Sequence, residues 1–228
     1  MTGEVAAVAA ASAAVGLVAG PFLQRVIDAS PPDPDDDPPP VPRTGPWLRR
    51  TRLLGVVLAV LNAGVALRLG VDAAVPAFLV LIGCLVTVSV IDLDLFLIPN
   101  RVIYPSLAAL AVLLCAAAVV EGDATRLRTA ALGGLGAWAA LLVVHLINPA
   151  GMGFGDVRLA AVIGAALGWL GYPEVVAGLF AGFVAASVIG IALLLVRRRG
   201  RKDAVPFGPF LAAGALFVVL GGDRLLGL

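Results

Sequence analysis

Two short stretches of an otherwise apolar chain carry carboxylates at places where such groups are costly to keep. Asp156 closes the stretch Gly-Met-Gly-Phe-Gly-Asp (151–156) and stands at the start of a long apolar run. Asp92 and Asp94 lie in a second stretch, residues 92–100, that follows another apolar run. Carboxylates at a membrane boundary are expensive unless they are paired or used in function, so both stretches are candidates for one site.

A pair of carboxylates suggests a definite chemistry. Two carboxyl groups that approach closely cannot both ionise, and they then share one proton. Such a pair can activate water and protonate a leaving amine, as in aspartic proteases. Asp92 and Asp94 would point roughly 200° apart on a helix, so only one of them can face Asp156. The other, which we expect to be Asp94, would be an interface carboxylate or a partner of Arg101 or Arg158.

The residues around these carboxylates indicate how the backbone would run. Pro99 disfavours helix at the residue before it, so the first stretch is expected to end in an extended turn. Gly153 and Gly155 permit close approaches that side chains would block, which would let a peptide lie beside Asp156. The alternative, that Asp156 only caps a helix, leaves the flanking glycines and the matching position of Asp92 without a role.

The composition defines the class of protein that must position these groups. The chain of 228 residues is 61% hydrophobic and only 14% charged, with a mean hydropathy of +1.04, whereas soluble proteins are about 25% charged. These values predict an all-α polytopic membrane protein in a lipid bilayer, because open sheet edges cannot be satisfied in hydrocarbon. The net charge of +1 gives no basic field for nucleic acid. Cys84 and Cys115 lie in apolar runs and suit buried small side chains.

Apolar runs long enough to cross a bilayer predict about eight helices, of which the sixth is the shortest. Closely spaced glycines at 133, 134 and 136, and again at 178 and 182, suit tight helix packing in lipid. The expected spans lie near 5–27, 51–70, 73–91, 102–120, 127–147, 157–171, 174–196 and 205–221.

The basic residues predict the orientation of these spans. With eight spans, twelve basic residues fall on one side and four on the other, and the richer side is expected to be cytoplasmic with both termini outside. On this topology Asp92 ends the third span and Asp156 begins the sixth span at the same cytoplasmic face. The four basic residues on the other, non-cytoplasmic side are Arg68, Arg126, Arg128 and Arg224.

The chain is expected to form a single domain, 1–228, in which residues 28–50 make a cytoplasmic loop rich in proline and aspartate. Its acidic run at 33–37 could attract a divalent cation, but consecutive carboxylates lack ligand geometry. A solvated linker is therefore expected, and no metal or cofactor is predicted for the chain.

The motifs resemble those of a known family. The stretch Gly-Phe-Gly-Asp-Val-Arg-Leu at 153–159 is similar to the Gly-x-Gly-Asp signature of membrane aspartyl proteases, and more specifically of type IV prepilin peptidases. Asp92, seven residues before the proline of Ile-Pro-Asn at 98–100, resembles the family's first motif. Residues 206–211 look like its last-helix segment, and residues 16–27 resemble its first helix less closely.

This resemblance implies an aspartic-type endopeptidase of the bacterial plasma membrane, active at the cytoplasmic face. It would cleave the basic leader from type IV prepilin-like precursors, with Flp/Tad-type precursors among the candidates. The resemblance assigns catalysis to Asp92 and Asp156. The supporting residues would be Asp94, Pro99, Asn100, Gly153 and Gly155.

One departure from the family and one alternative remain. Many members carry paired Cys-x-x-Cys motifs in the loop after the first helix and also methylate the new N-terminus. Residues 28–50 contain no cysteine, so a zinc site there is excluded, and the sequence does not decide whether the chain has N-methyltransferase activity. The alternative is a proton-coupled transporter component, which predicts acidic residues near mid-span and broken helices in repeated halves. Neither pattern is present in the sequence.

Overall fold

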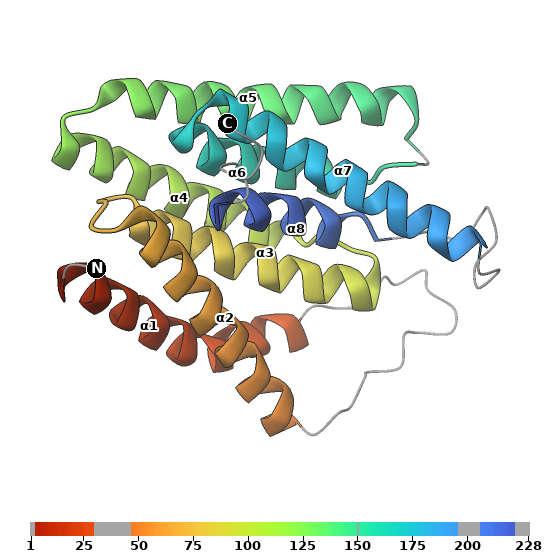
Figure 1. The fold of residues 1–228 in the computed structure, drawn as a ribbon. Coiled ribbons are helices and arrows are strands. Elements are labelled where there is room, and N and C mark those ends of the chain that lie inside the picture. Colours follow the sequence, from red (N-terminus) through yellow and green to blue (C-terminus); the bar gives the residue numbers. More distant parts are fainter. Residues whose placement is uncertain (1–2, 30–46, 150, 196–205, 222–228) are drawn as a thin grey trace.

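The computed structural model describes residues 3–29, 47–149, 151–195 and 206–221, and these ranges contain helices and no strand. The predicted all-α class is confirmed (Figure 1). The helices are α1 (Gly3–Asp28), α2 (Trp47–Leu69), α3 (Val75–Leu95), α4 (Asn100–Glu121), α5 (Ala124–Ile147), α6 (Phe154–Leu170), α7 (Tyr172–Leu195) and α8 (Gly208–Val219).

Two helix ends differ from the sequence prediction in ways that matter for the carboxylates. The third helix continues to Leu95, so Asp92 and Asp94 both lie inside its last turns. The sixth helix begins at Phe154, so Asp156 lies in its first turn. The acidic run at 33–37 and the basic run at 197–202 fall outside the described residues.

Successive helices alternate in direction, which gathers the motifs at one end of the bundle. Figure 1 shows the C-terminal ends of α1, α3, α5 and α7 together with the N-terminal ends of α2, α4, α6 and α8. We call this the site end, because it contains residues 92–100 and 151–156, and we call the other the opposite end. The predicted placement of both stretches at one end of the spans is therefore confirmed.

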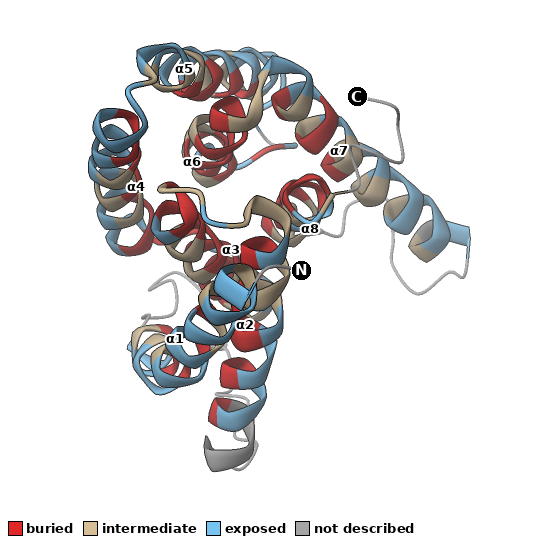
Figure 2. Ribbon diagram, turned by 60° about the vertical axis from the view of Figure 1, so that its left-hand side comes forward, coloured by how far each residue is buried: buried red, intermediate tan, exposed pale blue. Residues whose placement is uncertain are grey.

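Three helices form the centre of the bundle. More than half of the residues of α3, α6 and α8 are buried, and Figure 2 shows their buried surfaces turned toward one another. The hairpin of α1 and α2 packs on one side of α3, while α4, α5 and α7 cover the rest. One hydrophobic core contains side chains from all eight described helices.

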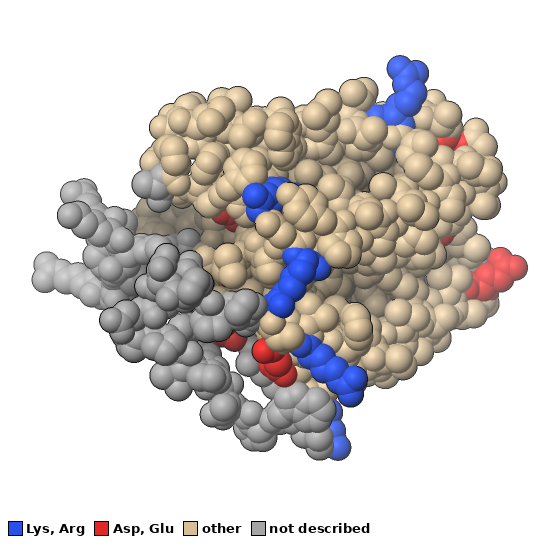
Figure 3. Space-filling model, turned by 180° about the vertical axis from the view of Figure 1, so that it is seen from behind, with Lys and Arg blue, Asp and Glu red and all other residues tan. Residues whose placement is uncertain are grey.

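The outer surface suits a bilayer. Six of the described helices are long and apolar enough to cross a membrane, whereas α6 and α8 are shorter. Large apolar side chains such as Val119 and Val18 are exposed on outer helices, as expected where lipid replaces water. On the face in Figure 3 a broad surface without charged side chains separates charged groups near the ends.

Glycines bring pairs of helices into backbone contact, as the sequence predicts for four of the five glycines it singled out. A methyl group added at Gly133 of α5 would lie 2.6 Å from the carbonyl oxygen of Gly164 of α6. One added at Gly182 of α7 would lie 3.0 Å from the carbonyl oxygen of Phe210 of α8. Gly136 is the exception, since no atom lies within 4 Å of such a methyl group.

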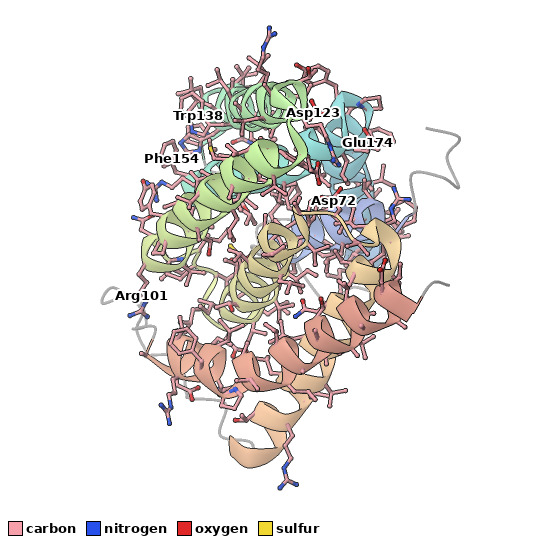
Figure 4. The ribbon with its side chains drawn as sticks, turned by 90° about the vertical axis from the view of Figure 1, so that its left-hand side faces the viewer. Asp72, Arg101, Asp123, Trp138, Phe154 and Glu174 are labelled. Atoms are coloured by element: carbon pink, nitrogen blue, oxygen red, sulfur yellow. The ribbon has the colours of Figure 1, made fainter. Side chains whose placement is uncertain are left out.

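At the opposite end, Arg126 links the connection between α2 and α3, the end of α4 and the end of α6. Arg126, in the first turn of α5, pairs with Asp72 at 3.1 Å and with Glu121 at 2.7 Å. Its guanidinium group also lies 4.6 Å from the ring centroid of Trp169, near the end of α6. Figure 4 looks onto this end, where Asp72 and Asp123 are labelled.

Candidate active site

Asp92 is a buried carboxylate held by the start of another helix. It lies in the last turns of α3 and is only 5% exposed. Its Oδ2 accepts a hydrogen bond of 2.9 Å from the backbone N–H of Gly208, the first residue of α8. The first N–H groups of a helix have no partner within the helix, so a carboxylate is well placed there. This contact joins two of the three central helices.

The end of α3 turns sharply just after Asp92. The backbone N–H of Phe96 donates to the carbonyl oxygen of Asp92, and Phe96 itself is left-handed with φ of 53°. Such a φ is uncommon for a residue other than glycine. Pro99 is then extended and precedes the first residue of α4, Asn100. The extended turn predicted at Pro99 is present, and it brings Ile98 back toward the helix ends.

Asp156 is the second buried carboxylate, 6% exposed, at the site end of α6. It occupies the third helical position after the N-cap residue Gly153, where an acidic side chain can reach back toward the N-cap backbone. A methyl group added at Gly153 would lie 3.3 Å from Asp156 Oδ2. The other oxygen, Oδ1, is buried and has no hydrogen-bond partner among the described residues. One oxygen of this carboxyl group thus lies beside the N-cap residue, and the other has no partner within the described ranges.

Ile98 connects the two carboxylate stretches. A methyl group added at Gly155 would lie 2.7 Å from Ile98 Cβ, and one added at Gly208 would lie 3.2 Å from Ile98 Cδ1. Ile98 thus touches the residue before Asp156 and the residue that donates to Asp92. Through these contacts the helix ends that carry Asp92 and Asp156 lie against the same isoleucine. The structure therefore brings together Asp92 and Asp156, which the sequence analysis paired.

The predicted role of Gly155 needs correction. We expected both glycines beside Asp156 to leave room for a peptide, but the space next to Gly155 is filled by Ile98. Gly155 permits a close contact within the protein itself. Gly153 is exposed. That a peptide substrate lies against the backbone at Gly153 stays a prediction.

Within the described ranges, Asp92 and Asp156 are the only buried residues with acidic or basic side chains. No third buried acidic side chain lies between them and the opposite end within those ranges. Asp94 is half-buried and points away from the direction of Asp92. No group of three potential metal ligands is present among the described residues.

Two residues that the sequence analysis did not assign to the site contribute to it. Gly208 holds Asp92 through its backbone N–H. In the sequence, this glycine stands between two Pro/Phe pairs, 206–207 and 209–210, near the expected start of the last helix. Arg158 donates from Nη1 to Asn100 Oδ1, although the sequence analysis considered it as a partner of Asp94. A backbone donor cannot be recognised from the type of residue, because every residue except proline has a backbone N–H group.

His145, in the last turn of α5, supports the glycine-rich stretch. Its Nδ1 lies 2.8 Å from the carbonyl oxygen of Met152, and its ring centroid lies 5.4 Å from that of Phe154. Because the partner is a carbonyl oxygen, Nδ1 is the donor. This histidine fixes residues 151–156 from the side of α5.

Comparisons with known proteins show which family the chain belongs to. Residues 79–195, more than half of the chain, match the sequence model of the Type IV leader peptidase family. Similar curated proteins include the prepilin leader peptidase/N-methyltransferases of Aeromonas hydrophila and Bacillus subtilis. The first is 35% identical over 189 residues, covering 79% of this chain and 61% of the relative. The second is 31% identical over 171 residues, covering 75% of this chain and 66% of the relative.

The match covers only part of these relatives, since the chain spans 60% to 66% of the length of the Aeromonas, Bacillus and Pseudomonas putida proteins. No solved structure matches the chain significantly. The family match includes both carboxylates of the candidate site and the stretches that carry them. The chain therefore belongs to the type IV leader peptidase family.

Proposed function

We propose that this protein is a membrane aspartic endopeptidase that removes the basic leader of type IV prepilin-like precursors, with Asp92 and Asp156 as the catalytic pair. The observation that carries this proposal is the burial of two carboxylates, from α3 and α6, whose stretches meet at Ile98 at one end of a membrane bundle. The relatives are named prepilin leader peptidase/N-methyltransferases, and this supports the substrate class. The excess of basic residues expected on the side of the site supports the proposal that the site faces the cytoplasm.

The reaction needs one carboxylate and one carboxylic acid. The carboxylate takes a proton from a water molecule while the water oxygen bonds to the scissile carbonyl carbon. The carboxylic acid hydrogen-bonds the carbonyl oxygen and then provides the proton that the leaving amine needs when the C–N bond breaks. Close approach of two carboxyl groups favours this singly protonated state. A precursor with an apolar helix would lie in the bilayer, and its basic leader would reach the site end.

The test is a cleavage assay in vesicles with a purified prepilin-like precursor, in which loss of the leader is followed by gel shift and mass spectrometry. Asp92→Asn and Asp156→Asn preserve shape and the ability to accept a hydrogen bond, so the fold should persist. Each should lower the cleavage rate by roughly 10²–10⁴-fold, the usual contribution of a general acid or base. Asp94→Asn is the matched control and should retain most activity.

Normal cleavage by either the Asp92 or the Asp156 variant would show that the pair is assigned wrongly. Full loss in the Asp94 variant, with activity kept at Asp92, would exchange their roles. The mass of the mature product reports separately on methylation.

A further inference from the structure

Arg158 of α6 makes three contacts, two of which join α6 to the start of α4. Its Nη1 donates to Asn100 Oδ1. Its guanidinium carbon lies 4.5 Å from the ring centroid of Phe154 and 6.0 Å from that of Tyr104. Figure 4 shows Phe154 on the same side of the bundle as Arg101, the neighbour of Asn100. One side chain thus bridges the two stretches that carry the carboxylates.

The spacing of the partners explains why the bridge forms. Phe154 and Arg158 are four residues apart on α6, so they share one face of that helix. Asn100 and Tyr104 are four residues apart on α4 and share a face in the same way. The planar guanidinium group can stack on a ring and donate to an amide oxygen at once, which a lysine ammonium group cannot do.

The surroundings restrict the position of Arg158 further. It forms no ion pair within the described residues, and its Nε is buried without a hydrogen-bond partner there. Its orientation therefore depends on Asn100 and the rings. Phe154 is in turn fixed by the ring of His145. These contacts run without a break from α5 through Phe154 and Arg158 to Asn100.

We propose that Arg158 is a positioning residue, which pins Asn100 and so holds Ile98 and Asp92 at the correct separation from Asp156. The proposal rests on the proposed peptidase function and names a residue that this reaction needs. Asn100 is two residues from Ile98, which packs against Gly155. Freeing Asn100 would let the connection between α3 and α4 move away from α6. Arg158 would act through this connection without touching the precursor.

The kinetic test compares five variants with the unmodified protein in the vesicle assay. Arg158→Ala and Asn100→Leu should each lower kcat by about tenfold or more and leave KM within about twofold, because small misplacements of catalytic groups are costly. The double variant should be no slower than the slower single variant, since both remove the same contact. Asn100→Asp keeps an acceptor for Arg158 and should lower kcat less than Asn100→Leu does. Arg101→Ala is the matched control, because it removes an exposed charge from the same turn.

A second readout does not depend on cleavage. Spin labels are placed at two exposed positions, Leu97→Cys in the first stretch and Ile147→Cys at the end of α5, which contacts the second stretch through His145. In a cysteine-free background they report the distance between the first stretch and this support of the second. The distance distribution should broaden with Arg158→Ala and with Asn100→Leu, and stay narrow with Arg101→Ala. An unchanged distribution together with unchanged kcat would overturn the proposal. A raised KM for Arg158→Ala with a silent Asn100→Leu would instead identify a precursor contact and overturn it too.

Failure of the proposed function is distinguishable from failure of this inference. If Asp92→Asn and Asp156→Asn cleave normally, or if the unmodified protein cleaves no precursor, the function is wrong. The spin-label distances then still decide whether Arg158 holds the two stretches together.

Discussion

Gly155→Ala is the smallest change that should separate the carboxylates without unfolding the protein. The added methyl group would lie 2.7 Å from Ile98 Cβ, whereas carbon atoms in contact are normally about 3.5–4.0 Å apart. The connection between α3 and α4 must therefore move by about 1 Å relative to α6. Gly155 has no positive φ, so alanine fits its backbone and only the contact with Ile98 opposes it.

The expected effects on stability and activity differ in size. Overpacking costs about 1–3 kcal/mol, while alanine in place of glycine in a helix returns about 1 kcal/mol. The free energy of unfolding should thus fall by no more than about 2 kcal/mol. A displacement of about 1 Å in a catalytic group can lower a rate by about 10²-fold. We expect kcat to fall by about that factor while the protein still accumulates and melts cooperatively.

The assay measures kcat for precursor cleavage in vesicles and the thermal midpoint in detergent. Gly136→Ala is the control, since no atom lies within 4 Å of the added methyl group. A second substitution tests the cause, because Ile98→Gly removes the opposing Cβ and should restore part of the activity of Gly155→Ala. Ile98→Ala keeps that Cβ and should not. Cleavage by Gly155→Ala at the unmodified rate would refute the contact as a feature of the active state.

Two further changes test other parts of the structure. Gly208→Ala would place a methyl group 2.8 Å from Asp92 Oδ2 and should lower kcat by at least about tenfold, measured in the same assay with the thermal midpoint as control. Arg126→Ala removes the pairs with Asp72 and Glu121 at the opposite end. Because Arg126 is partly exposed, it should lower the free energy of unfolding by about 1–2 kcal/mol. Its cleavage rate per folded molecule should stay unchanged, and a reduced rate would show that the two ends are coupled.

The helices and the two carboxylate stretches could be predicted from the sequence because they follow from local patterns. Long apolar runs define membrane helices directly. The alternation of the helices then places Asp92 and Asp156 at one end, whatever the details of packing. The family motifs selected Asp92 over Asp94, and the structure buries Asp92 while Asp94 is half-buried.

The remaining contacts could not be predicted, because they depend on the packing of helices far apart in the chain. The donor to Asp92 is a backbone N–H that lies 116 residues away. The role of Gly155 depends on one isoleucine that returns from an irregular turn. Residue types alone suggested an acidic partner for Arg158, but the helix faces present an amide and two rings. These contacts depend on which residues become neighbours when the helices pack, and local sequence patterns do not specify those neighbours.

The different surroundings of the two carboxylates point to different roles. Asp92 Oδ2 accepts the N–H of Gly208, so its orientation is set by α3 and α8 together. Asp156 Oδ1 has no partner within the described ranges, and Asp156 stands beside the exposed glycine Gly153. A carboxylate oxygen that no protein group engages is the one that can hydrogen-bond a reacting water or carbonyl. We infer that Asp156 makes the first contact with the reacting groups, while Asp92, held from two helices, supplies the fixed half of the pair.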